Sequence, residues 1–107
     1  MVTVFVCTEC PTGAERLAKV QKALRGQPCR VQGNACLSGC RSGASVALRA
    51  SGRMAYLFGP LQPEDMAFLP VLIGEYLAAP RGEILDARPL GSLRLRVLAR
   101  IPACRED

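Results

Sequence analysis

Hydrophobic and polar positions along this chain change their period several times, and each change predicts a separate secondary-structure element. Residues 1–6 form a run of β-branched and apolar side chains, which is typical of a buried strand. Residues 12–25 then repeat apolar positions at helical spacing, with Thr12 as the expected N-cap and Gly26 as the stop. The chain is therefore expected to begin with a strand and an amphipathic helix.

The middle of the chain predicts a second strand and a hairpin. Residues 29–35 are a weak strand candidate, since only part of the segment is apolar. Residues 44–50 and 53–58 flank Ser51-Gly52, a pair that suits a tight hairpin turn. We therefore expect the two hairpin strands to be antiparallel.

The remaining part of the chain predicts a second helix and an edge strand. Residues 63–79 have helical character, and Pro70 should kink or split the helix because proline has no N–H to donate. Residues 93–97 alternate leucine and arginine, as an edge strand with outward arginines does. The order is β-α-β-β-β-α with a C-terminal tail. It predicts a two-layer α/β fold of thioredoxin type in which the first two strands are parallel.

Length and composition restrict the function. The 107 residues are enough for one domain, expected as a core at about residues 1–79 with a tail at 80–107. The chain has six cysteines and no histidine. The lack of histidine excludes Ser-His-Asp and Cys-His catalysis, histidine-ligated zinc, Rieske clusters and histidine-ligated haem. Function is therefore expected to depend on sulfur, in a binding or carrier protein rather than an enzyme.

The sequence predicts a cytoplasmic protein with no membrane partner. Its longest apolar stretch, residues 66–79, is too short to span a bilayer and contains Glu75. The first residues lack the basic region and the apolar core of a signal peptide. The net charge of +5 is compatible with an acidic protein partner. No nucleic acid is expected as a partner, because the five aromatic residues follow no stacking pattern.

Four cysteines form two pairs that the predicted topology brings together. Cys7 and Cys10 form a C-x2-C after the first strand, and Cys36 and Cys40 form a C-x3-C in a glycine-rich loop after the second. Because parallel strands end at the same edge of a sheet, both pairs should meet in the crevice there. Four thiolates at one point repel each other unless a cation compensates them, so a metal ion or an iron–sulfur core is expected.

The same residues carry a family resemblance. Residues 36–43 and the hairpin at 46–56 resemble the second half of a thioredoxin-like [2Fe-2S] ferredoxin, and residues 4–7 with the following helix are similar to its start. The whole run, including its ending at 99–102, resembles an uncharacterised bacterial family of predicted metal-binding proteins. The resemblance implies a [2Fe-2S] electron carrier with a redox partner protein, a homodimer as its assembly, and the ligands Cys7, Cys10, Cys36 and Cys40.

Two other functions stay open. Zinc binds the same C-x2-C spacing, in a structural or metal-handling module with no redox role. The second alternative is a thiol–disulfide function of Cys7 and Cys10, because a C-x-x-C between a strand and a helix is the setting of thioredoxin-type chemistry.

The remaining cysteines and the tail arginines have less specific roles in the sequence. The ferredoxins place more residues between their first two cysteines, so Cys29 is a reserve candidate for the second ligand. Cys104 is expected to be a structural or free thiol. The tail arginines are expected to face solvent or to dock an acidic redox partner: Arg88, Arg94, Arg96, Arg100 and Arg105.

Overall fold

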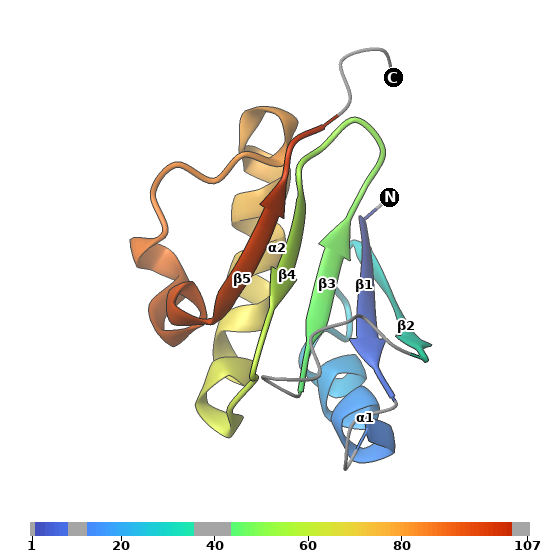
Figure 1. Ribbon diagram of the computed structural model, residues 1–107. Helices are drawn as coiled ribbons and strands as arrows, with labels where there is room; N and C mark the ends of the chain where they lie inside the picture. The colour runs from blue at the N-terminus through green and yellow to red at the C-terminus, as the bar shows by residue number, and fades with distance from the viewer. Residues whose placement is uncertain (1, 9–12, 36–43, 104–107) are drawn as a thin grey trace.

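The protein is built on one mixed β-sheet (Figure 1). The computed structural model describes residues 2–8, 13–35 and 44–103. The strands are β1 (Val2–Cys7), β2 (Cys29–Asn34), β3 (Val46–Arg49), β4 (Ala55–Phe58) and β5 (Val97–Ile101). The α-helices are α1 (Gly13–Ala23) and α2 (Leu69–Ala78), and 3₁₀ segments cover η1 (Pro63–Phe68), η2 (Pro80–Gly82) and η3 (Arg88–Arg96).

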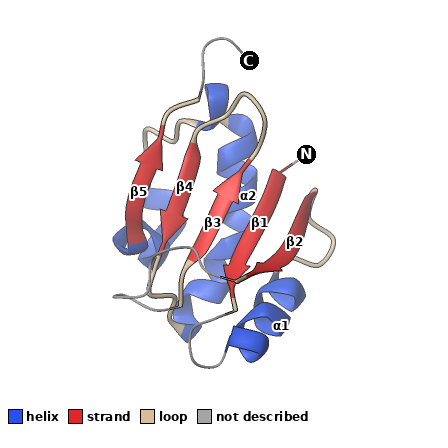
Figure 2. Ribbon diagram, turned by 45° about the vertical axis from the view of Figure 1, so that its right-hand side comes forward, coloured by secondary structure: helices blue, strands red, loops and turns tan. Residues whose placement is uncertain are grey.

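The topology of the sheet confirms the predicted fold class. The strand order is β2-β1-β3-β4-β5. β1 pairs with β2 in parallel, whereas the pairs β1–β3, β3–β4 and β4–β5 are antiparallel. Figures 1 and 2 show α1 and α2 on the same face of the sheet, so the fold has two layers. In the described part of the chain, no helix is long and apolar enough to cross a membrane.

The core lies between the sheet and these two helices. Alternate residues of β1 point to the same face, and Val2, Val4 and Val6 are all buried there. Phe58 and Tyr76 are almost fully buried. The helices cover the sheet with Val20, Leu24, Leu69, Leu72 and Ile73. The opposite face of the sheet carries the other set of strand side chains, which are half-buried or exposed except for the fully buried Cys7.

Proline splits the second helix as predicted. The segment expected as one helix over residues 63–79 is the 3₁₀ segment η1 followed by α2. Pro70 lies in the first turn of α2, where its missing N–H leaves no helical hydrogen bond unmade. Thr12, the expected cap of the first helix, lies outside the described residues. Gly26, the predicted stop of that helix, has φ of +85°, a conformation that glycine adopts at little cost.

The predicted position of the last strand is wrong. Residues 93–96 belong to η3, and the edge strand β5 begins only at Val97. The alternation of leucine and arginine does not mark one sheet face, because Leu93 is fully buried and Leu95 is 70% exposed. β5 pairs with β4, so the tail completes the sheet that the core begins.

A buried carboxylate attaches this tail to η1. Asp65 is fully buried. It accepts a hydrogen bond from the Ser92 hydroxyl at 2.5 Å, one from Arg96 Nε at 2.9 Å, and one from the backbone N–H of Gln62 at 2.7 Å. Burial by itself favours the neutral acid. The three hydrogen bonds and the charge of Arg96 outweigh this effect, so the pKa of Asp65 lies below its ordinary value.

Replacing Asp65 by asparagine should destabilise the protein and remove part of its sensitivity to acid. We expect Asp65→Asn to lose about 3 kcal/mol of unfolding free energy at pH 7, because Arg96 is left without its buried partner. In the wild type, the stabilisation is complete above the unfolded-state pKa of about 4 and is lost as pH falls through the lower folded-state pKa. Urea unfolding from pH 7 to pH 3 should therefore show a steeper loss for the wild type than for the variant, and parallel curves would contradict this assignment.

Candidate metal centre

Three strands bring their backbones together at the end of β1. Cys7 is the last residue of β1 and lies in register with Asn34, the last residue of the parallel strand β2. Its N–H donates to the carbonyl oxygen of Ser45, which precedes β3, at 3.0 Å. The next amide, that of Thr8, donates to the carbonyl oxygen of Asn34 at 2.9 Å. The ends of β1 and β2 and the start of β3 therefore form one edge of the sheet.

The two cysteine-containing connections leave and return at this edge. Residues 9–12 join Thr8 to Gly13, and a Cβ on Gly13 would clash with the Thr8 carbonyl oxygen, so the start of α1 lies directly against the residue that follows β1. Residues 36–43 join Ala35 to Ala44. Three of the predicted ligands belong to these two connections and lie outside the described residues: Cys10, Cys36 and Cys40. The spare Cys104, near the end of the chain, also lies outside the described residues. Their convergence with Cys7 stays a prediction.

Cys7 is the predicted ligand that the structure describes. Its side chain is fully buried, and its Sγ lies 3.9 Å from the carbonyl oxygen of Ala35, the residue that precedes Cys36. The sulfur is therefore oriented toward the point where the chain leaves β2. Within residues 2–8, 13–35 and 44–103, no three cysteine or carboxylate side chains come together as a metal site.

A buried arginine holds the backbone of Cys7. Arg16 is 8% exposed, and its guanidinium donates to the Cys7 carbonyl oxygen at 2.9 Å. Sequence reasoning missed this residue, although Arg16 lies one turn before Val20 on the buried face of α1. The arrangement fixes the backbone of Cys7 with a buried, charged hydrogen-bond donor from α1.

A buried serine lies directly opposite Cys7. The register that pairs Val6 with Val46 continues to Cys7 and Ser45, so the two side chains lie on the same face of the sheet. Ser45 is fully buried, and its Oγ has no hydrogen-bond partner among the described residues. A cation and an unused hydroxyl donor beside a cysteine fit a metal–sulfur group better than a neutral thiol in an apolar core. The sequence held no signal for Ser45 beyond its place before a strand.

Cys29 cannot replace Cys10 in a site that contains Cys7. The parallel register places Cys29 beside Val2 at the other end of β1. The five steps along the strand from Val2 to Cys7 separate the two cysteines by about 17 Å. Metal–sulfur bonds are about 2.3 Å long. Burial also raises the pKa of the Cys29 thiol, which disfavours the thiolate that binds metals. Cys29 thus lies apart from the candidate metal centre and packs against the core.

The fold and the matching family now define the class of this protein. Its α/β architecture is that of the thioredoxin-like ferredoxins. The chain belongs to the DUF1636 family, described as a protein of unknown function, whose model matches residues 4–103. A comparison with curated protein sequences found no match.

Solved structures with the same fold include a thioredoxin-like [2Fe-2S] ferredoxin from Aquifex aeolicus. It is 18% identical, with a TM-score of 0.59 over 94% of this chain and 92% of that chain. A structure described as the wild-type Aquifex aeolicus ferredoxin is 20% identical, with a TM-score of 0.56 over 92% of this chain and 97% of that chain. The likeness extends beyond residue 79, so the tail is not specific to the DUF1636 family. It confirms the predicted thioredoxin-like fold.

The hydrogen bond from Arg16 to the Cys7 carbonyl oxygen should contribute measurably to the free energy of unfolding. We expect Arg16→Met to lower the unfolding free energy by about 2 kcal/mol, because a buried carbonyl loses a charged hydrogen-bond donor. The matched control is Arg25→Met, since Arg25 is an exposed arginine just beyond the end of α1. Urea unfolding of both variants checks this. Equal stability of the two variants would show that the buried contact contributes nothing.

Proposed function

We propose that this protein is a one-electron carrier that holds a [2Fe-2S] cluster on Cys7, Cys10, Cys36 and Cys40. The observation that carries the proposal is the environment of Cys7. Its sulfur lies at the sheet edge where both cysteine connections begin and end. Arg16 holds the Cys7 carbonyl oxygen, and Ser45, whose hydroxyl has no partner among the described residues, lies opposite Cys7. The fold shared with proteins described as [2Fe-2S] ferredoxins supports it.

The chain's own residues would supply ligands, charge compensation and rigidity. A bound [2Fe-2S] cluster takes up and releases one electron. Cys7 contributes one thiolate from the end of a paired strand, so its backbone is already fixed by two neighbouring strands. Arg16 holds the Cys7 carbonyl and offsets part of the negative charge of the thiolates. No substrate of its own is required, because the electron comes from a reduced partner protein and leaves to an oxidised one.

Metal analysis is the direct test of this function. The protein is purified without oxygen, and iron, sulfide, zinc and the visible spectrum are measured on one sample. Equal amounts of iron and sulfide, with colour that dithionite bleaches, would support the proposal. One zinc and no colour would contradict it. An empty protein is treated with iron and sulfide, and a failure to form the cluster then contradicts the proposal as well.

Serine substitutions should separate the proposed ligands from the spare cysteines. Cys36→Ser and Cys40→Ser are each expected to abolish cluster binding, because serine is a poor ligand for iron in place of a thiolate. Cys29→Ser and Cys104→Ser are the matched controls and should keep the full iron and sulfide content. Retention of the cluster in a Cys36 or Cys40 variant, or its loss in a control, would mean that the proposed ligand set is wrong.

Several of the described tail arginines are already paired with carboxylates. Arg88 pairs with Asp86 at 2.9 Å, and Arg100 lies 3.7 Å from Glu83. Arg96 is committed to the buried Asp65. Three of the five tail arginines therefore already have carboxylate partners within the tail and η1, and Arg105 lies outside the described residues. We place the docking of the redox partner on another surface.

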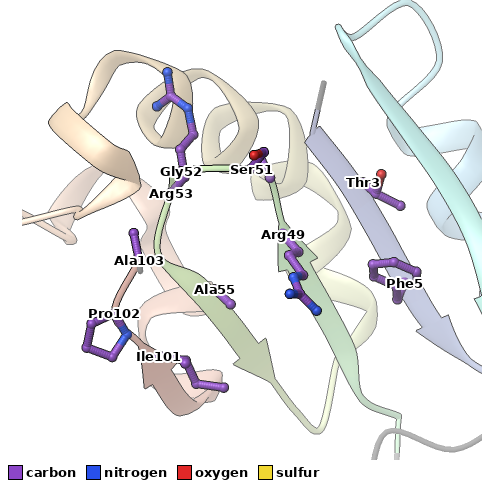
Figure 3. A pocket seen from close by; sticks show the side chains of 11 residues that line it. Thr3, Phe5, Arg49, Ser51, Gly52, Arg53, Ala55, Ile101, Pro102 and Ala103 are labelled. Atoms are coloured by element: carbon purple, nitrogen blue, oxygen red, sulfur yellow. The ribbon is translucent and has the colours of Figure 1, made fainter. Parts of the chain in front are cut away.

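The uncovered face of the sheet is our candidate for this docking. It contains a hollow of about 540 Å³ lined by Thr3, Phe5 and Arg49, among others, and a neighbouring hollow of about 340 Å³ (Figure 3). No acidic side chain lines either hollow. In Figure 3 the Arg49 guanidinium lies over this face near Phe5, whereas Arg53 points away, and its NH1 donates to the Tyr76 carbonyl oxygen at the end of α2. The face thus combines apolar side chains with polar ones and an exposed positive charge.

Position and size both suit a transient partner. The larger hollow lies toward the β3–β4 turn, whereas the neighbouring hollow extends from Phe5 to Asn34, which is in register with Cys7 at the cysteine-bearing edge. Five strands of about five residues give a face of about 400 Å². A stable interface buries about 800 Å² per partner, whereas redox encounters are smaller. These quantities favour a short-lived acidic redox partner over a second copy of this chain.

Charge reversal on this face should weaken the binding of an acidic electron carrier. The probe is flavodoxin, an acidic one-electron flavoprotein, and its binding is measured by calorimetry at low salt. We expect Arg49→Glu to weaken binding about tenfold, since a charge in the contact is reversed. Arg25→Glu, which makes the same change of net charge at the end of α1, should bind like the wild type.

Equal losses in the two charge variants would contradict docking on the uncovered face, as would a wild-type protein that does not bind flavodoxin. Analytical ultracentrifugation of the wild type and of Arg49→Glu tests whether the uncovered face instead binds a second copy of this chain. A dimer that the substitution dissociates would assign the face to a second copy of this chain.

A further inference from the structure

The buried hydroxyl of Ser45 is unexplained by the fold alone. Ser45 is fully buried, and no described residue accepts or donates a hydrogen bond at its Oγ. An unpaired buried hydroxyl destabilises a folded protein, and an alanine at the same position would remove that cost. A serine that costs stability in the folded chain is expected to make its hydrogen bond with something that the chain binds.

The position of Ser45 indicates what that group is. Ser45 and Cys7 form the last pair of the β1–β3 ladder, in which the Cys7 amide donates to the Ser45 carbonyl oxygen at 3.0 Å. Side chains of such a pair lie on the same face with Cβ atoms about 5 Å apart. The hydroxyl therefore lies next to the Cys7 side chain, and a sulfur acceptor placed there is within its reach.

We propose that Ser45 is a positioning residue of the metal centre, whose Oγ donates a hydrogen bond to the sulfur at Cys7 when the group is bound. The proposal rests on the proposed function and adds a residue that the cysteine pattern does not contain. The hydrogen bond opposes the build-up of negative charge on sulfur, so it stabilises the reduced form of an iron–sulfur centre and raises its reduction potential. It also slows the loss of the metal by holding a ligand in place.

The test compares the effect of Ser45→Ala on the metal-free protein with its effect on the loaded protein. The substitution should leave the metal-free protein as stable or more stable, but it should weaken metal retention in the loaded protein. In the metal-free protein, Ser45→Ala should keep or raise the unfolding midpoint, since an unpaired hydroxyl is removed. In the loaded protein, the same variant should release iron to a chelator about tenfold faster than the wild type. Its reduction potential should become more negative.

Two further variants make the result specific. Ser45→Thr keeps the hydroxyl, so it should restore the wild-type potential and release rate. Ser51→Ala removes an exposed serine hydroxyl in the β3–β4 turn, so it should change neither quantity.

The outcomes separate this proposal from the proposed function. Iron and sulfide in the wild type, together with an unchanged potential and release rate in Ser45→Ala, would overturn the role of Ser45 and leave the carrier function standing. A lower midpoint of metal-free Ser45→Ala would also overturn it, because the hydroxyl would then have a structural partner. A wild type that holds no cluster after reconstitution refutes the carrier function itself, and the role of Ser45 with it.

Discussion

The parallel pairing of β1 with β2 is the constraint on which the candidate site depends. A parallel pair needs a crossover, and α1 supplies it by returning the chain to the start of β2. Both strands then end at the same edge, where Cys7 lies beside Asn34. The chain leaves this edge in one cysteine connection and re-enters it from the other. A shift of register would move the two connections apart and would turn the core-facing valines of β1 to the other face.

The protein interior next to this edge contains more buried polar groups than a sequence selected only for a stable fold would place there. The buried guanidinium of Arg16 holds the Cys7 carbonyl oxygen, and the buried hydroxyl of Ser45 has no partner among the described residues. The other buried positions that the structure describes are almost all apolar. Each of these groups has a desolvation cost that an apolar side chain would avoid. Such costs concentrate where a protein binds something, because the bound group completes the hydrogen bonds and compensates the charge. The polar residues therefore indicate function at the same place as the cysteines.

The other buried ionic group has a structural role at a distance from this edge. Asp65 connects η1 with η3 through Ser92 and Arg96, and in this way it positions the chain for entry into β5. Because these partners neutralise each other, the tail presents less positive charge than its composition indicates. Exposed cationic side chains also lie on the uncovered face of the sheet and on α1, among them Arg49, Lys19 and Lys22. Net charge alone thus says little about where a partner binds.

Local pattern by itself determined the order of the elements, the split at Pro70, the hairpin at Ser51-Gly52 and the parallel start of the sheet. These features depend on residues that are neighbours in sequence, so periodicity and turn chemistry were sufficient. The four clustered cysteines were visible for the same reason. The tertiary structure alone decided that Arg16 is buried against Cys7, that Ser45 lies opposite it, that Cys29 lies at the far end of β1, and that the last strand starts at Val97. Each of these depends on contacts between residues 9 to 46 positions apart, and no local pattern encodes which distant side chain will lie against a buried charge or hydroxyl.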